Sequence, residues 1–303
     1  MKLPKQLHER YLSTLKHADT EETIDLWFYR PVGFMVALLG EKLHWTPNAI
    51  TIFGIFLGIG SGLLIYPSDL FLNLLGMLLL VMADVCDSAD GQLARMTKSY
   101  SRLGRILDGV SSDIWFASIY ICIALRFTPE WGLSIWMLAV AAAGCHALQA
   151  AMSDHYRQFH LFFANGKNGS ELDTSQDVAD EYSSISFSKE PVRKVFIFFY
   201  RYYTLLQEFL NPQMTSLREK IRTTDGGNVS PQFCEDMRRA TLPLMKWTNV
   251  LTYNWRAITL FVSILMQRPW LYLACEVTVF NILLVYMLVS HERICKSIKN
   301  INI

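Results

Sequence analysis

The sequence predicts an all-α integral membrane protein with six transmembrane helices arranged as three antiparallel hairpins. Of its 303 residues, 51% are hydrophobic, and the mean hydropathy of +0.21 comes from apolar residues gathered in blocks. Spanning about 30 Å of hydrocarbon takes roughly 20 helical residues. Runs near that length occur at 49–66, 70 to about 86, 114–127, 132–152, 257–266 and 270–290.

The four parts of the chain follow in order. Residues 1–48 are expected to form a cytoplasmic tail and an interfacial helix, because charges interrupt the aromatic run at 24–45. Residues 49–157 hold the first four spans. Residues 158–247 form a large cytoplasmic insertion, in which a mobile polar loop (165–191) precedes a surface-lying helix (192–222). Residues 248–303 hold the last two spans and a cytoplasmic tail.

The third and fifth apolar runs are short, so their helices should continue into the polar stretches 104–113 and 248–256. Short turns at 67–69, 128–130 and 267–269 join the paired spans and lie on one side of the membrane. The other side carries all of the 28 lysines and arginines except Arg126 and Arg268. By the positive-inside rule, that side and both termini are cytoplasmic.

A net charge of +1 offers no basic excess for nucleic acid. Charge gathers instead at two helix ends between the second and third apolar runs. At 100° per residue, one narrow helical stripe contains Asp87, Asp90, Gly91 and Ala94. Gly104 and Asp108 share a face of the next helix. Carboxylates without His or Cys suit Mg²⁺, Mn²⁺ or Ca²⁺, and metals held in this way usually also hold substrate phosphates.

The pattern Asp87-x2-Asp90-Gly91-x2-Ala94-Arg95-x8-Gly104-x3-Asp108 resembles the signature of the CDP-alcohol phosphotransferase family, six-helix membrane enzymes of phospholipid synthesis. The segment TPNAIT at 46–51 also resembles that family's entry to its first span. The resemblance covers 24–157 by pattern and 248–295 through topology alone. It implies that aspartates hold one or two divalent cations, Mg²⁺ or Mn²⁺, against the diphosphate of a CDP-linked donor while an acceptor hydroxyl displaces CMP.

The resemblance also implies a role for each matching residue. The metal ligands are Asp87, Asp90 and Asp108, and Asp108 is also a candidate catalytic residue. The positions that pack against the CDP moiety are Gly91, Ala94 and Gly104. Arg95 contacts a donor phosphate.

One position departs from the family pattern, which places a fourth aspartate where this chain has Ser112. On a regular helix Asp113 lies about 140° from Asp108, whereas Ser112 lies about 40° from it. A π-bulge near Gly109 would turn Asp113 toward the site, and we favour this resolution. Asp113 is then the fourth metal ligand and the candidate base. Alternatively, Asp84 supplies the missing charge.

The favoured reaction transfers a phosphatidyl group from CDP-diacylglycerol to a polar alcohol, phosphorylated or not, because Arg157 and Arg256 flank the site and are candidates for binding an anionic acceptor. The alternative within the family is a choline or ethanolamine phosphotransferase with a lipid alcohol as acceptor. Alternatives of other classes are a catalytically silent membrane scaffold and a divalent-cation transporter.

Two further groups of residues have competing interpretations. A stripe of glycines in the first span is either a homodimer face or a site of close packing within one chain: Gly54, Gly58 and Gly62. Polar residues at depth in the fourth and sixth spans are either substrate contacts or, as we favour, interhelical hydrogen-bond partners: His146, Gln149, Glu276 and Asn281.

Overall fold

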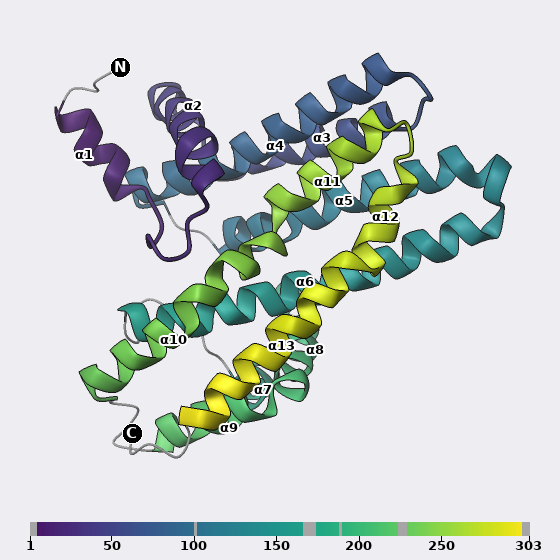
Figure 1. Ribbon diagram of the computed structural model, residues 1–303. Coiled ribbons are helices and arrows are strands. Elements are labelled where there is room, and N and C mark those ends of the chain that lie inside the picture. The colour runs from purple at the N-terminus through teal and green to yellow at the C-terminus, as the bar shows by residue number, and fades with distance from the viewer. Residues whose placement is uncertain (1–4, 100–101, 166–173, 188–189, 224–228, 299–303) are drawn as a thin grey trace. The chain divides into compact units, whose positions relative to one another are not determined.

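The computed structural model describes residues 5–99, 102–165, 174–187, 190–223 and 229–298 (Figure 1). Every regular element in these ranges is a helix, which confirms the all-α class. The elements up to the fourth long helix are α1 (Lys5–Ser13), the π-helical turn η1 (Asp25–Tyr29), α2 (Arg30–Lys42), α3 (Pro47–Ile65), α4 (Leu70–Thr97), α5 (Arg102–Trp131) and α6 (Leu133–Asn165). They are followed by α7 (Ser175–Ser184), α8 (Pro191–Leu210), α9 (Pro212–Thr223), α10 (Pro231–Val250), α11 (Tyr253–Leu265), α12 (Trp270–Val277) and α13 (Val279–Ile298).

The chain folds into two compact units. The first contains residues 1–147 and 252–280, and the second contains residues 148–251 and 281–303. The signature-bearing helices α4 and α5 belong to the first unit. The second unit is built largely from the stretch that the sequence marks as an insertion.

Five stretches of the described residues are long and apolar enough to cross a membrane, whereas the sequence predicts six spans. They are Pro47–Ile65, Leu70–Thr97, Leu107–Trp131, Leu133–Asn165 and Trp270–Ile298. The predicted fifth span falls on α11, which has 13 residues and a length of about 20 Å. Such a helix is too short for about 30 Å of hydrocarbon, so the six-span hairpin arrangement stays a prediction.

Of the two predicted polar helix extensions, one is confirmed and the other is wrong. Helix α5 runs without a break from Arg102 to Trp131 and carries the polar stretch 104–113, as predicted. The stretch 248–256 is divided instead, since α10 ends at Val250 and α11 begins at Tyr253. The prediction of a continuous helix there is wrong.

Two of the three expected turns lie between helices, at 67–69 and 267–269. The third does not, because α5 continues through Pro129 and the chain turns at Gly132, whose φ is +56°. A glycine tolerates this left-handed conformation at no steric cost, so it ends the helix where proline does not.

The glycine stripe of α3 packs within the chain. A Cβ on Gly58 would lie 1.9 Å from Trp115 Cδ1, and a Cβ on Gly62 would lie 2.3 Å from Ser118 Oγ, both on α5. Gly54 faces Cys86 of α4 in the same way, at 3.1 Å. These glycines therefore let α3 approach its neighbours closely, which favours internal packing over the homodimer face.

We expect Gly58→Ala to destabilise the protein by about 1–3 kcal/mol, because Trp115 is fully buried and has no room to move away from the new methyl group. Gly144→Ala is the matched control, since a Cβ there meets no atom within 4 Å. Thermal unfolding in detergent measures both. Equal melting temperatures for the two variants would contradict the close packing of α3 on α5.

Hydrogen bonds between helices hold the second unit together. The Glu292 carboxylate on α13 accepts from the backbone N–H groups of Gln213 and Met214, at the start of α9. Gln207 of α8 donates to the Ala151 carbonyl oxygen of α6 at 2.9 Å. The contacts of Glu292 satisfy two backbone donors at the start of α9, which have no partner within their own helix.

Part of the predicted mobile loop is a helix, α7, so that expectation is wrong for 175–184, while 166–173 lie outside the described residues. A capping box starts α7: the Thr174 hydroxyl accepts from the Asp177 N–H, and the Asp177 carboxylate accepts from the Thr174 N–H. The Thr-x-x-Asp spacing is a sequence signal for this start. The expected surface helix is two helices, α8 and α9, which meet at Asn211.

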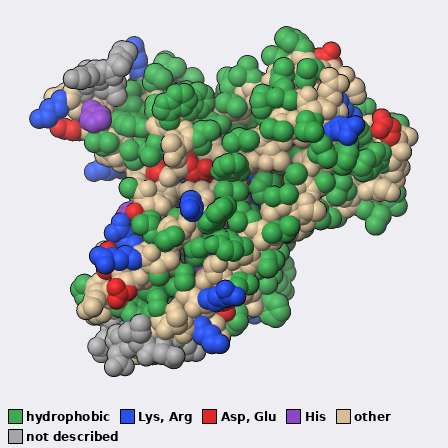
Figure 2. Space-filling view, viewed as in Figure 1, with side chains coloured by type: hydrophobic (Ala, Val, Ile, Leu, Met, Phe, Trp, Pro, Cys, Tyr) green, Lys and Arg blue, Asp and Glu red, His purple; other side chains and the backbone are tan. Residues whose placement is uncertain are grey.

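Apolar side chains remain exposed on the long helices. Figure 2 shows hydrophobic residues over much of the visible surface of the first unit. On α3 and α4, large residues more than half exposed include Phe53, Phe56, Leu63, Phe71 and Leu78. Exposed apolar surface of this extent marks a membrane-facing region in helices that are long enough to span.

Candidate active site

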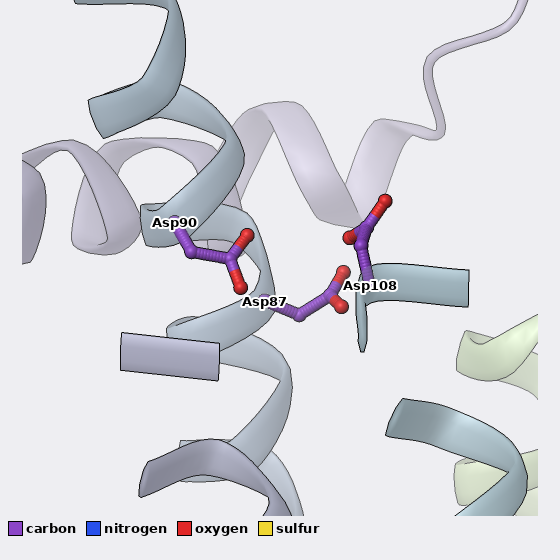
Figure 3. Close-up of side chains that lie close together, drawn as sticks. All are labelled: Asp87, Asp90 and Asp108. Carbon is purple, nitrogen blue, oxygen red and sulfur yellow. The ribbon is translucent and has the colours of Figure 1, made fainter. Parts of the chain in front are cut away.

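Three carboxylates of the signature meet in the first unit (Figure 3). Asp87 and Asp90 project from α4 toward Asp108 of α5, and one oxygen of each lies within 4.8 Å of the others. Asp90 is buried, Asp87 is half-buried and Asp108 is exposed. The group therefore reaches from the packed interior to solvent, and a ligand has access from the exposed side.

Hydroxyl groups on neighbouring helices hold two of these carboxylates. The Thr51 hydroxyl of α3 donates to Asp90 Oδ2, and Ser111 Oγ of α5 donates to Asp87 Oδ1 at 3.3 Å. A buried carboxylate is costly unless it is hydrogen-bonded or paired, so Thr51 supports Asp90 in its place. Thr51 closes the TPNAIT segment, which gave a sequence signal for it, whereas no pattern indicated Ser111.

The other signature residues lie along the same helices. Arg95 lies over Gly91, where a Cβ would be 3.4 Å from Arg95 Nη1. Arg95 Nε also donates to the Thr14 carbonyl oxygen at 2.7 Å. Ala94 and Gly104 are partly exposed, on α4 and α5. Their nucleotide-binding roles stay predictions.

The π-bulge expected near Gly109 is not present, because α5 is a regular α-helix across that position. The three-carboxylate group consequently does not include Asp113. The Asp113 side chain is 58% exposed, and its Oδ1 lies 3.9 Å from His146 Nε2 on α6. The alternative candidate, Asp84 of α4, is an electrostatic neighbour of Asp87 and lies outside the group as well.

A buried polar chain extends from His146. Its Nδ1 lies 2.7 Å from the Tyr120 hydroxyl, which lies 3.1 Å from the Tyr272 hydroxyl. The Tyr272 hydroxyl donates to Glu276 Oε1 at 2.7 Å, and Arg256 Nη1 donates to both Glu276 oxygens at 2.7 Å. Arg256 is 1% exposed and Glu276 is fully buried. Arg256, a predicted contact for the acceptor, is therefore paired with Glu276 in the structure.

Interhelical pairing also accounts for the remaining polar residues at depth. Within the second unit, Gln149 of α6 donates to Asn281 Oδ1 of α13 at 2.9 Å. Arg157 belongs to the second unit too, and its Nη2 donates to Asn249 Oδ1 at 3.3 Å. Hydrogen bonding between helices, the favoured interpretation, is therefore what the structure shows for Gln149 and Asn281. The role of Arg157 as an acceptor contact stays a prediction.

Part of the chain is similar to known proteins. Residues 44–160 match the sequence model of the CDP-alcohol phosphatidyltransferase family. Over 95 residues the chain is 30% identical to a protein of Aquifex aeolicus (strain VF5) named bifunctional IPC transferase and DIPP synthase. That match covers 31% of this chain and 21% of the relative, so the chain matches about a fifth of the relative's length.

The match at residues 44–160 is to the same family that the signature resembles, the CDP-alcohol phosphatidyltransferases. Members of this family are transferases of phosphate-containing groups and use a CDP-linked donor and an alcohol acceptor. The matched segment contains α3, α4 and α5 and hence all three carboxylates of the group.

Proposed function

We propose that this protein transfers a phosphatidyl group from CDP-diacylglycerol to a polar alcohol, phosphorylated or not, at the membrane surface. The observation that carries the proposal is the meeting of Asp87, Asp90 and Asp108 within 4.8 Å, in a segment that matches a CDP-alcohol phosphatidyltransferase. The excess of lysine and arginine on one side of the predicted spans supports a cytoplasmic site.

The donor set fits Mg²⁺ or Mn²⁺. All three ligating groups are hard carboxylate oxygens, and no His or Cys among the described residues joins them. Such a cation, when bound, neutralises charge on the donor diphosphate and orients it for displacement. Thr51 holds Asp90, and Ser111 holds Asp87, so that the two carboxylates face the exposed Asp108.

The remaining signature residues would bind the donor. Gly91 and Gly104 leave room for the cytidine nucleotide close to the helix backbones, and Ala94 adds only a methyl group. Arg95 carries a permanent charge next to Gly91 and is suited to a phosphate oxygen.

The reaction needs one proton acceptor. A new bond forms between the acceptor oxygen and the phosphorus that carries diacylglycerol, the bond between the two phosphates breaks, and CMP leaves. The proton of the acceptor hydroxyl passes to a carboxylate, and Asp113 is the candidate because it is exposed and lies outside the metal-binding group. His146, held by Tyr120, faces Asp113 from α6.

We expect Asp113→Asn to lower kcat by about a hundredfold or more, because an amide cannot take the acceptor's proton. The same change should leave the apparent affinity for Mg²⁺ nearly unaltered. Initial rates of CMP release across a Mg²⁺ titration measure both quantities. A large rise in the required Mg²⁺ with an unchanged kcat would instead make Asp113 the fourth metal ligand.

The donor and acceptor are tested together by measuring CMP release with CDP-diacylglycerol and a panel of polar alcohols, free and phosphorylated. CDP-choline and CDP-ethanolamine with diacylglycerol form the second arm. We expect turnover with CDP-diacylglycerol alone. Turnover confined to the second arm would place the lipid on the acceptor, and retained CDP binding without turnover in either arm would favour the catalytically silent scaffold.

A further inference from the structure

His146 of α6 lies between two polar groups of α5, all within the first unit. Its Nε2 atom lies 3.9 Å from Asp113 Oδ1, and its Nδ1 atom lies 2.7 Å from the Tyr120 hydroxyl oxygen. The imidazole ring also packs on Phe116, with 4.8 Å between the ring centroids. His146 is 6% exposed, whereas the Asp113 side chain is exposed. The buried ring therefore directs one nitrogen at the carboxylate that is the candidate base.

The hydrogen-bond network assigns the position of the proton on His146. The Tyr120 hydroxyl lies 2.7 Å from His146 Nδ1, 3.1 Å from the Tyr272 hydroxyl and 3.3 Å from Glu276 Oε1. A hydroxyl has one proton to donate, and the shortest of these contacts is the one to His146. Tyr272 gives its own proton to Glu276 Oε1 at 2.7 Å. With Nδ1 as the acceptor, a neutral imidazole carries its proton on Nε2, the atom that faces Asp113.

An ion pair holds the far end of this network. Arg256 Nη1 donates to both oxygens of Glu276 at 2.7 Å, and both side chains are buried. A buried polar network whose members are hydrogen-bonded is rigid. Tyr120, which lies between Glu276 and His146, is thereby fixed, and the imidazole is held in one orientation.

Asp113 needs such support because of its place on α5. The signature that the chain resembles has an aspartate where this chain has Ser112. On the regular helix α5, the side chain at position 113 is turned by about 100° from the side chain at position 112. Asp113 consequently lies outside the three-carboxylate group, and the neighbour that the structure gives it is His146 of α6.

We propose that His146 is a positioning residue for Asp113, and this inference rests on the proposed function. Its Nε2–H donates to Asp113 Oδ1 and leaves Oδ2 to accept the proton of the acceptor hydroxyl, while the hydroxyl oxygen bonds to phosphorus and CMP leaves. The separation of 3.9 Å is wider than a hydrogen bond, and catalytic hydrogen bonds commonly shorten when substrate binds. The proton then passes to solvent, because Asp113 is exposed.

The test compares His146→Ala with His160→Ala. His160 is also a buried histidine of α6, and its Nδ1 lies 2.7 Å from the Thr241 hydroxyl within the second unit. Initial rates of CMP release from CDP-diacylglycerol should give a kcat for His146→Ala about tenfold to a hundredfold below wild type, with KM for the donor nearly unchanged. His160→Ala should keep the wild-type kcat. Thermal unfolding in detergent confirms that both variants fold.

Two further variants separate positioning from packing. His146→Gln keeps an amide N–H that can take the place of the imidazole Nε2–H, and it should recover most of the lost kcat. His146→Ala combined with Asp113→Asn should be no slower than Asp113→Asn alone, because a positioning residue has no effect once the group that it positions is gone.

Three results would overturn the inference and leave the transferase proposal standing. The first is a kcat for folded His146→Ala that equals that of the wild type or of His160→Ala. The second is a pair of losses that multiply in the double variant, which would give His146 a role independent of Asp113. The third is a wild-type kcat in Asp113→Asn. If the wild-type protein releases no CMP from any donor, the proposed function fails and the inference fails with it.

Discussion

Replacing Asp90 with asparagine is expected to lower CMP release by about a thousandfold or more. The amide keeps the size of the side chain and removes the charge that holds a cation, and a bound metal supplies several kcal/mol of transition-state stabilisation. Asp90 is the buried member of the carboxylate group and accepts a hydrogen bond from Thr51. An asparagine there still accepts that bond, so the fold should persist while turnover disappears.

The matched control is Asp236→Asn, which makes the same change at an exposed position on α10. It should retain wild-type turnover. Size-exclusion chromatography and thermal unfolding in detergent confirm that both variants fold. Near-normal turnover in a folded Asp90→Asn protein would contradict a metal site built on this residue.

The second large effect is on stability. Arg256→Met is expected to destabilise the protein by about 3–5 kcal/mol, because it leaves the fully buried Glu276 carboxylate without its cation. Tyr272 still donates one hydrogen bond to Glu276, which does not replace a charge. The loss appears as a lower melting temperature in the absence of any substrate.

A double variant, Arg256→Met with Glu276→Met, separates pairing from substrate binding. It should regain much of the lost stability, because no uncompensated charge stays buried. Arg239→Met, which breaks an exposed pair with Glu235, should have little effect. Wild-type stability in Arg256→Met, together with a large rise in acceptor KM, would show instead that Arg256 serves the acceptor.

Much of the fold follows from hydrophobic run length. The runs at 49–66 and 70–86 became α3 and the apolar part of α4, because apolar segments of this length have few alternatives to a helix. The predicted fifth span failed as a continuous helix because α10 and α11 separate at Leu251 and Thr252, and no proline or glycine marks that break. Composition alone does not reveal such an interruption.

The carboxylate group was predictable because helical periodicity aligns Asp87 with Asp90, and the spacing of Gly104 and Asp108 does the same on the next helix. The residues that pack around this group were not predictable from the sequence. Thr14 lies about eighty residues before the residues of α4 that it contacts, Gln92 and Arg95, and only tertiary folding brings it there. The π-bulge was a wrong prediction, because the need for a fourth aspartate does not impose a bulge on α5.

The most direct measurement is CMP release from CDP-diacylglycerol by the purified protein in detergent, with and without Mg²⁺. The carboxylate site predicts turnover that stops on addition of EDTA, returns with Mg²⁺ or Mn²⁺, and is absent from Asp90→Asn. Turnover that is unaffected by EDTA, or that survives in Asp90→Asn, would contradict metal-assisted transfer at Asp87, Asp90 and Asp108.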